Sequence, residues 1–306
     1  MPVSVIERNL NAMEFVKLNV LHLHLSDDQG FRVESKKYPL LHERGSDNQY
    51  YTHQQIHHLV EYARERRIRI VPEFDIPGHT TSWFVGYPHL ASAPKVYSIQ
   101  RGWGTFKPTM DPSRETTFEF LDAFFNETTS LFPDKYFHIG GDEVEGTQWT
   151  QSKLIRTWKR QLGLNTNHDI QRYFTHRVQQ LLSKYNRFIV GWDEILPAVE
   201  SNSSSVIQSW RDRRSLVRTV HHGQGAILSS PFYLDALNPA GTYYSVNPMK
   251  GIKWLLNKKQ TVKVFGGEAC MWTEAVSFDT VDSRIWPRTA AIAERFWSPE
   301  YITDVN

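Results

Sequence analysis

YFHIGGDE, at residues 136–143, is the stretch that decides the fold of this chain. Residues 136–139 form an apolar run of strand length, and the two glycines after it allow a tight turn and a close approach to the backbone. Asp142 and Glu143 come next, and neighbouring side chains at a strand end point to opposite sides. The stretch therefore predicts a strand that brings acidic side chains to one edge of a sheet.

The same order, an apolar run followed by an amphipathic helical stretch, repeats along the chain. We expect seven strands, at residues 20–25, 68–74, 136–139, 188–191, 206–209, 225–229 and 262–265. We expect helices at residues 3–18, 53–67, 116–132, 170–185, 213–222 and 284–297. Strands that alternate with helices predict a parallel sheet covered by helices.

Polar, acidic or aromatic residues follow almost every expected strand. A site built from the carboxyl ends of many strands is typical of a barrel, whereas a doubly wound sheet concentrates its site at one switch point. We therefore predict an α/β fold of the (β/α)8 TIM barrel class, with one domain over residues 1–306. Such a barrel needs eight strands and this chain opens with a helix, so we expect the first strand to precede Met1.

The composition restricts the partners of the chain. Lys and Arg number 35 against 33 Asp and Glu, a formal net charge of +2, so we expect neither nucleic acid nor an anionic membrane as a partner. The single cysteine, Cys270, forms no internal disulfide. The opening residues lack the pattern of a signal peptide, so this chain does not itself indicate a compartment.

The Asp142–Glu143 pair suits the cleavage of a glycosidic bond. That reaction needs one carboxyl group kept protonated and a second group that stabilises positive charge on the sugar. The alternative for a bare Asp-Glu pair is to cap the following helix. Its position after a strand and two glycines, in a predicted barrel, favours the catalytic interpretation.

Three tryptophans, Trp192, Trp210 and Trp272, follow the ends of three different expected strands. Tyr233, which also follows a strand, adds a hydroxyl group. Together these side chains predict a small, partly apolar pocket with a hydrogen-bond donor at its edge, which fits an N-acetyl group.

These motifs resemble those of the β-N-acetylhexosaminidases of glycoside hydrolase family 20. The resemblance spans nearly the whole chain and rests on residues 21–29 (LHLHLSDDQ), 76–79 (IPGH), 138–143 (HIGGDE) and 266–274 (GGEACMWTE). It implies retaining hydrolysis of terminal non-reducing β-linked N-acetylglucosamine or N-acetylgalactosamine, in which the substrate's own acetamido group attacks the anomeric carbon. It also implies no metal or organic cofactor, and a secreted, periplasmic or lysosomal location.

The resemblance assigns a role to each candidate residue. Glu143 is expected to protonate the leaving oxygen and then to activate water, and Asp142 to orient the acetamido group and stabilise the oxazolinium. For this, Glu143 has to be partly desolvated and Asp142 has to stay ionised. The other expected site residues are Trp192, Trp210 and Trp272 around the acetamido group, Tyr233 on its oxygen, Asp235 and Glu274 on sugar hydroxyls, and Asp27 and His79 beside the catalytic pair.

A metal-dependent hydrolase is the first alternative. His22 and His24 lie on one face of the first expected strand, where such barrels place an early pair of ligands. Further histidine ligands are missing from the later strand ends, so we interpret both histidines as packed, hydrogen-bonded residues of the sheet.

A catalytically impaired fragment, or a non-catalytic protein that binds N-acetylhexosamine, is the second alternative. In the family the first strand carries an arginine that binds hydroxyl groups of the terminal sugar. No arginine here takes that position, and we expect Arg8, in the opening helix, to lie on the surface. The preference between the two sugars, the natural glycan and the oligomeric state do not follow from the sequence.

Overall fold

Each of the seven apolar runs forms a strand in the computed structural model, which describes residues 1–304. A short additional strand, β2, pairs antiparallel with β1. The strands are β1 (Val20–Asp27), β2 (Gly30–Phe31), β3 (Arg69–Phe74), β4 (Tyr136–His138), β5 (Phe188–Trp192), β6 (Val206–Ser209), β7 (Gly225–Leu228) and β8 (Val264–Gly267). They belong to two units that alternate along the chain, residues 1–21, 61–69 and 201–306 (unit 1) and residues 22–60 and 70–200 (unit 2).

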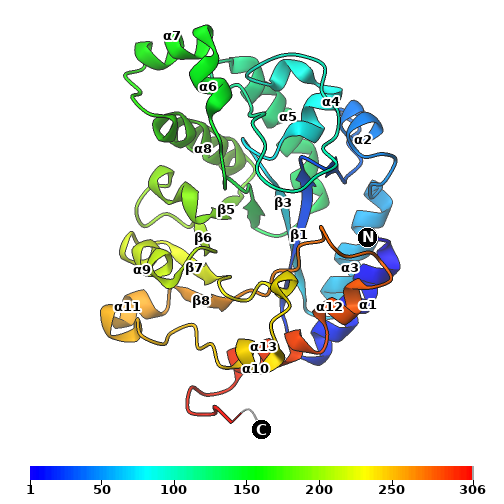
Figure 1. Ribbon diagram of the computed structural model, residues 1–306, viewed down its shortest axis with the longest axis vertical. Coiled ribbons are helices and arrows are strands. Elements are labelled where there is room, and N and C mark those ends of the chain that lie inside the picture. The colour runs from blue at the N-terminus through cyan, green and yellow to red at the C-terminus, as the bar shows by residue number, and fades with distance from the viewer. Residues whose placement is uncertain (305–306) are drawn as a thin grey trace. The chain divides into compact units, whose positions relative to one another are not determined.

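Unit 2 contains a sheet in the order β2-β1-β3-β4-β5. Figure 1 labels β1, β3 and β5 of this sheet. The parallel pairing of β3 with β4 sets Glu73 opposite His138. The long helices α5 (Glu115–Leu131) and α8 (Asn167–Lys184) pack against each other, and α8 also contacts β5. Phe74 and Phe137 on the sheet and Phe124 on α5 are buried together at ring distances of 5.0–5.7 Å. This aromatic core fixes the strands whose ends carry the acidic residues.

The remaining helices of unit 2 are short except for α7. They are α2 (Leu40–Gly45), α4 (Thr81–Gly86), α6 (Thr147–Gln151) and α7 (Lys153–Gln161), with 3-10 turns η1 (Pro88–Leu90) and η2 (Asp193–Ala198). The helix α3 (His53–Glu65) belongs partly to each unit.

Unit 1 contains the parallel strands β6, β7 and β8. Its helices are α1 (Val3–Phe15), α9 (Arg213–His221), α10 (Ala240–Tyr244), α11 (Lys258–Thr261), α12 (Val281–Ile285) and α13 (Arg288–Trp297), with η3 (Leu234–Ala236) and η4 (Lys253–Leu255). Leu216 of α9, Leu228 of β7 and Ile292 of α13 belong to one buried apolar cluster. Arg8 lies on the surface of α1 as expected, half-exposed and 2.8 Å from Asp282.

The single helix expected at residues 284–297 is wrong. Pro287 divides that stretch into α12 and α13. Proline has no N–H for the helix and forces the residue before it out of the helical region, and Trp286 accordingly has φ −106° and ψ 146°. The last strand also begins at Val264 rather than at residue 262, because α11 with its Asn257 capping box comes directly before it. In residues 1–304 we find no helix with both the length and the apolarity to span a membrane.

Candidate active site

The loop after β4 carries Asp142 and Glu143, and its shape depends on glycine. Gly140 and Gly141 have φ values of 65° and 91°, in the region that residues with side chains rarely adopt. A Cβ atom on Gly140 would lie 1.8 Å from Oδ1 of Asp75. The backbone N–H of Gly141 donates to the same Oδ1 at 3.0 Å. The two glycines therefore let the loop pass against the Asp75 carboxyl group.

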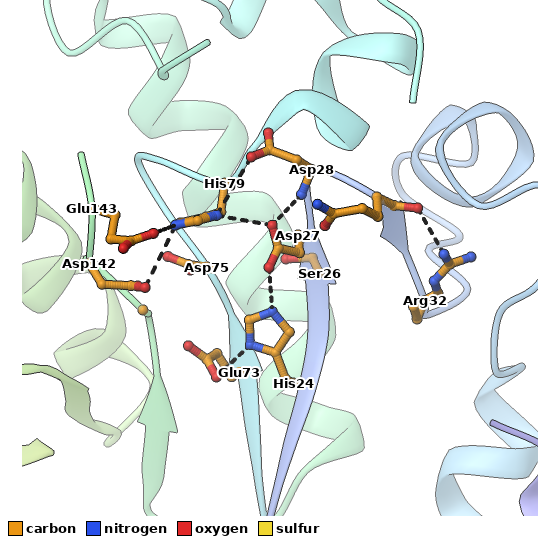
Figure 2. Close-up of polar contacts among 12 residues, drawn as sticks. His24, Ser26, Asp27, Asp28, Arg32, Glu73, Asp75, His79, Asp142 and Glu143 are labelled. Atoms are coloured by element: carbon orange, nitrogen blue, oxygen red, sulfur yellow. Dashed lines mark hydrogen bonds and ion pairs between the residues drawn. The ribbon is translucent and has the colours of Figure 1, made fainter. Parts of the chain in front are cut away.

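A chain of polar contacts runs from β1 to this loop (Figure 2). Nδ1 of His79 lies 3.1 Å from Oδ1 of Asp27. Nε2 of the same imidazole lies 3.6 Å from Oδ2 of Asp142 and 3.6 Å from Oε2 of Glu143. The structure thus brings together four of the expected site residues, with His79 between Asp27 and the two carboxyl groups.

A second group of contacts centres on Glu73, which the sequence analysis did not identify. Its Oε2 lies 2.8 Å from His22 and 2.7 Å from His24. Its Oε1 lies 3.1 Å from Nδ1 of His138 and accepts a hydrogen bond of 3.0 Å from the indole N–H of Trp192. His24 is therefore a hydrogen-bonded residue of the sheet, and His22 is an ion-pair partner of Glu73. Trp192, expected to line the acetamido pocket, is buried here and holds this carboxylate.

The electrostatics of these groups follow from burial and from their partners. Burial alone would raise the pKa of Glu73, but His138, His24 and His22 hold it well below its usual range. Burial would likewise lower the pKa of His79, yet Asp75 and Asp27 raise it well above the ordinary histidine value. His24 and His79 hold the pKa of Asp27 well below its ordinary value against the effect of burial, so Asp27 and His79 each favour the charged form of the other.

The carboxyl groups of Asp75 and Asp142 lie close together, and the imidazole of His79 lies near both of them. Burial raises the pKa of Asp142 to about 6, although the nearby His79 opposes the shift. Burial and the charge of Asp142 raise the pKa of Asp75 well above its usual range. With a pKa of about 6, Asp142 is mostly ionised at neutral pH, which is the state that its expected role requires.

Glu143 is more exposed than we expected for the desolvated acid. Its side chain is 40% exposed, against 14% for Asp142. Its backbone has a positive φ of 48°. The hydroxyl group of Thr105 donates to Oε2 of Glu143 at 2.8 Å. Thr105 reaches the site from a long loop, and no pattern in the sequence points to it.

The other expected site residues lie in unit 1. Trp210 and Trp272 are half-buried, Tyr233 is half-buried, and Asp235 and Glu274 are exposed. The segment at Tyr233 pairs in parallel with the segment at Cys270, two residues before Trp272. The structure therefore brings Tyr233 and the Trp272 segment together within unit 1.

Three groups of side chains among residues 1–304 have donor atoms close enough to share one metal ion. These groups are His22, Glu73 and His138; Asp27, Asp28 and His79; and Asp75, His79 and Asp142. In the first two, carboxylate oxygens already lie at hydrogen-bond distance from imidazole nitrogens. Hydrogen bonding accounts for the spacing of the side chains in these two groups.

Acidic side chains at the ends of parallel strands, with two carboxyl groups in different environments, suit the acid–base chemistry of an α/β glycoside hydrolase. The chain belongs to glycosyl hydrolase family 20, because the model of that family's catalytic domain matches residues 1–300. It is 36% identical to β-hexosaminidase subunit beta of Mus musculus and 35% identical to that of Homo sapiens. All of this chain is covered in both comparisons, but it spans only 58% and 56% of the two relatives.

Solved structures agree with this assignment. A chitobiase from Flavobacterium johnsoniae superimposes with a TM-score of 0.95 at 45% identity, over 100% of this chain and 47% of the chitobiase. A Vibrio harveyi exo-β-N-acetylglucosaminidase in complex with N-acetylglucosamine gives a TM-score of 0.87 at 26% identity, over 100% of this chain and 53% of that enzyme. The predicted fold class, an α/β chain of the (β/α)8 TIM barrel type, is confirmed.

Proposed function

We propose that this chain is the catalytic domain, over residues 1–306, of a retaining β-N-acetylhexosaminidase. It releases terminal non-reducing β-linked N-acetylglucosamine or N-acetylgalactosamine from oligosaccharides or glycoconjugates. The observation that carries the proposal is the Asp142–Glu143 pair, with His79 3.6 Å from each carboxyl group, in a chain that the family's catalytic domain matches over residues 1–300.

Asp142 is suited to hold the acetamido group. Its Oδ1 is buried and has no hydrogen-bond partner within residues 1–304, so it can accept the acetamido N–H of a substrate. An ionised Asp142 keeps the acetamido oxygen directed at the anomeric carbon and stabilises the positive charge of the oxazolinium that forms. No side chain of the enzyme then has to attack the sugar.

Glu143 is suited to move the proton. It donates a proton to the glycosidic oxygen as the bond to the anomeric carbon breaks, and then accepts one from the water that opens the oxazolinium. Thr105 and His79 lie beside its Oε2 and fix the carboxyl group for both steps. Trp192, Trp210, Tyr233, Asp235, Trp272 and Glu274 are proposed to bind the sugar.

The test is turnover of an aryl β-N-acetylglucosaminide by Glu143→Gln. An amide cannot deliver the proton, so we expect kcat to fall by about 10²–10⁴-fold. The matched control is Glu145→Gln, because Glu145 is an exposed neighbour that bonds to Thr147, and it should keep wild-type turnover. A thiazoline that mimics the oxazoline should inhibit the wild type.

Two results would contradict the proposal. Near-normal turnover by Glu143→Gln would show that Glu143 is not the general acid. Hydrolysis that the thiazoline does not inhibit would contradict the substrate-assisted mechanism. A wild-type chain that binds N-acetylglucosamine but does not hydrolyse the aryl glycoside would be a sugar-binding protein instead.

A further inference from the structure

A hollow of about 550 Å³ lies beside the catalytic loop, within unit 2. Its walls come from the loop between η1 and α5 and from the α6 segment. The lining residues are Ala93, Lys95, Gln100, Thr105, Phe106, Lys107, Pro108, Gln148 and Gln151. A volume of this size holds a monosaccharide.

The hollow is adjacent to the proton donor. Thr105 both lines it and donates its hydroxyl hydrogen to Oε2 of Glu143 at 2.8 Å. An acid that protonates a glycosidic oxygen has the leaving group of the substrate bonded to that same oxygen. The hollow beside Glu143 is therefore placed for the sugar that departs.

The loop that forms most of the hollow is held at its base and at its tip. At the base, Ala91 and Met110 form an antiparallel bridge. At the tip, the backbone N–H of Gln100 donates to the carbonyl of Asp28 at 3.1 Å, and Gln29 donates from its side chain to the carbonyl of Gly102 at 3.0 Å. The lining residues are thus fixed relative to the segment that carries Asp27 and Asp28.

The charge of the lining is one-sided. Lys95 and Lys107 are exposed cations, and the lining contains no carboxylate. Lys107 contributes to lowering the pKa of Glu145, although the main cause of that shift is the side-chain hydrogen bond of Glu145 to Thr147. The rest of the lining includes three glutamines and Phe106. A surface that combines amides, an aromatic ring and positive charge suits a sugar that carries an anion.

We propose that this hollow binds the leaving-group side of the substrate and favours an acidic sugar there, one with a carboxylate or a sulfate. The inference rests on the proposed function, because it takes Glu143 as the group that protonates the leaving oxygen. It adds a specificity that the catalytic pair does not determine, and it assigns that specificity to Lys95 and Lys107.

The experiment compares two disaccharides that differ in one group, N-acetylglucosamine β-linked to glucuronic acid and the same sugar β-linked to glucose. The full chain is assayed for kcat/KM and, by calorimetry, for binding. We expect kcat/KM for the acidic disaccharide to exceed that for the neutral one by about two- to fivefold at low ionic strength, which is the effect that an exposed ion pair usually has. The ratio should fall as salt screens the charges.

The double variant Lys95→Gln/Lys107→Gln should bring the ratio of kcat/KM values close to one. The matched control is Lys36→Gln, because Lys36 is an exposed lysine of the same unit outside the hollow, and it should leave the ratio at the wild-type value. The same comparison made on the dissociation constants decides the point without turnover.

Two results would overturn the inference. One is a wild-type ratio of one or less, in rates and in binding. The other is a preference for the acidic disaccharide that survives in the double variant, which would place the recognition elsewhere. If the aryl glycoside and both disaccharides stay intact while acidic binding still depends on the two lysines, the proposed catalytic function fails and the anion-binding hollow stands.

Discussion

Glu73 illustrates how the site tolerates a buried charge. Its side chain is 1% exposed, and its two oxygens contact three imidazoles and one indole. Removing one partner of a buried ion pair costs about 3–5 kcal/mol, because the other charge is left without compensation. His24 links this carboxylate to Asp27 at 3.1 Å. Glu73 therefore acts on the proposed catalytic pair through the residues that it positions, and its charge also helps to raise the pKa of Asp142.

The acid limb of the pH profile should report Asp142. Its pKa is raised to about 6. In the proposed mechanism the ionised form holds the acetamido group, so activity should rise as pH increases through about 6. Below that value we expect kcat/KM to fall by about tenfold per pH unit. The measurement is kcat/KM for an aryl β-N-acetylglucosaminide between about pH 4 and pH 8.

Asp142→Asn provides the check on that assignment. Its amide does not titrate, so the residual activity of the variant should lack this limb. An unchanged limb in the variant would assign the titration to another group. The stability of the fold has the opposite sign: a carboxyl group whose pKa is raised on folding stabilises the native state at low pH, and this contribution is lost as pH rises through about 6.

The sequence pointed to Asp142 and Glu143 as the proposed catalytic pair, but it did not indicate the residues around them. Asp142 and Glu143 stand out because two glycines and an apolar strand precede them. Glu73 and Asp75 lie in or directly after the apolar strand β3, where a charged residue in a buried run is a signal that we could have used. Thr105 contacts Glu143 because a long loop brings it there, and local sequence patterns do not determine the path of such a loop.

Among the elements, the loop between β4 and α6 has the strictest requirement on residue type. Gly140 has φ 65° and lies against the carboxyl group of Asp75. Gly163, after α7, has φ 67° but has no atom near the position of a Cβ. Both glycines therefore have a positive φ, but only Gly140 lies against another side chain.

Gly140→Ala should destabilise the chain more than Gly163→Ala. A side chain at positive φ costs about 1–3 kcal/mol at either position, and the contact with Asp75 adds about 1–3 kcal/mol at Gly140 alone. The free energy of unfolding from denaturant titrations measures the difference. Equal losses in the two variants would show that the Asp75 contact carries no cost.

The element boundaries were predictable where apolar periodicity was strong. Every expected strand formed, because short runs of Val, Ile, Leu and Phe leave few other ways to bury their side chains. The apolar residues in the stretch 284–297 keep a helical spacing across Pro287. That spacing predicted one continuous helix in spite of the proline. The structure shows that the missing N–H decides, since α12 ends at Ile285 and α13 begins at Arg288.

At the scale of the whole molecule, the two units share regular elements. β1, α3 and β3 each lie partly in unit 1 and partly in unit 2. Melting one unit therefore removes hydrogen bonds from elements of the other. Neither unit corresponds to one continuous stretch of the chain.

We expect thermal unfolding to proceed in one cooperative transition. The calorimetric enthalpy should equal the van't Hoff enthalpy, which is the usual test for two-state behaviour. The near-ultraviolet and far-ultraviolet circular dichroism signals should change together. Two resolved transitions would show that the shared elements fray at the unit boundaries without loss of the rest.

The alternation of the units along the chain also governs recombination with relatives. A chimeric gene with a single crossover always mixes parental sequence inside at least one unit, because unit 1 is built from three separate stretches. Exchanging residues 22–200 as one cassette brings only residues 61–69 into unit 1 from the second parent. Cassette junctions at 21/22 and 200/201 are therefore the ones that preserve most of the co-adapted packing.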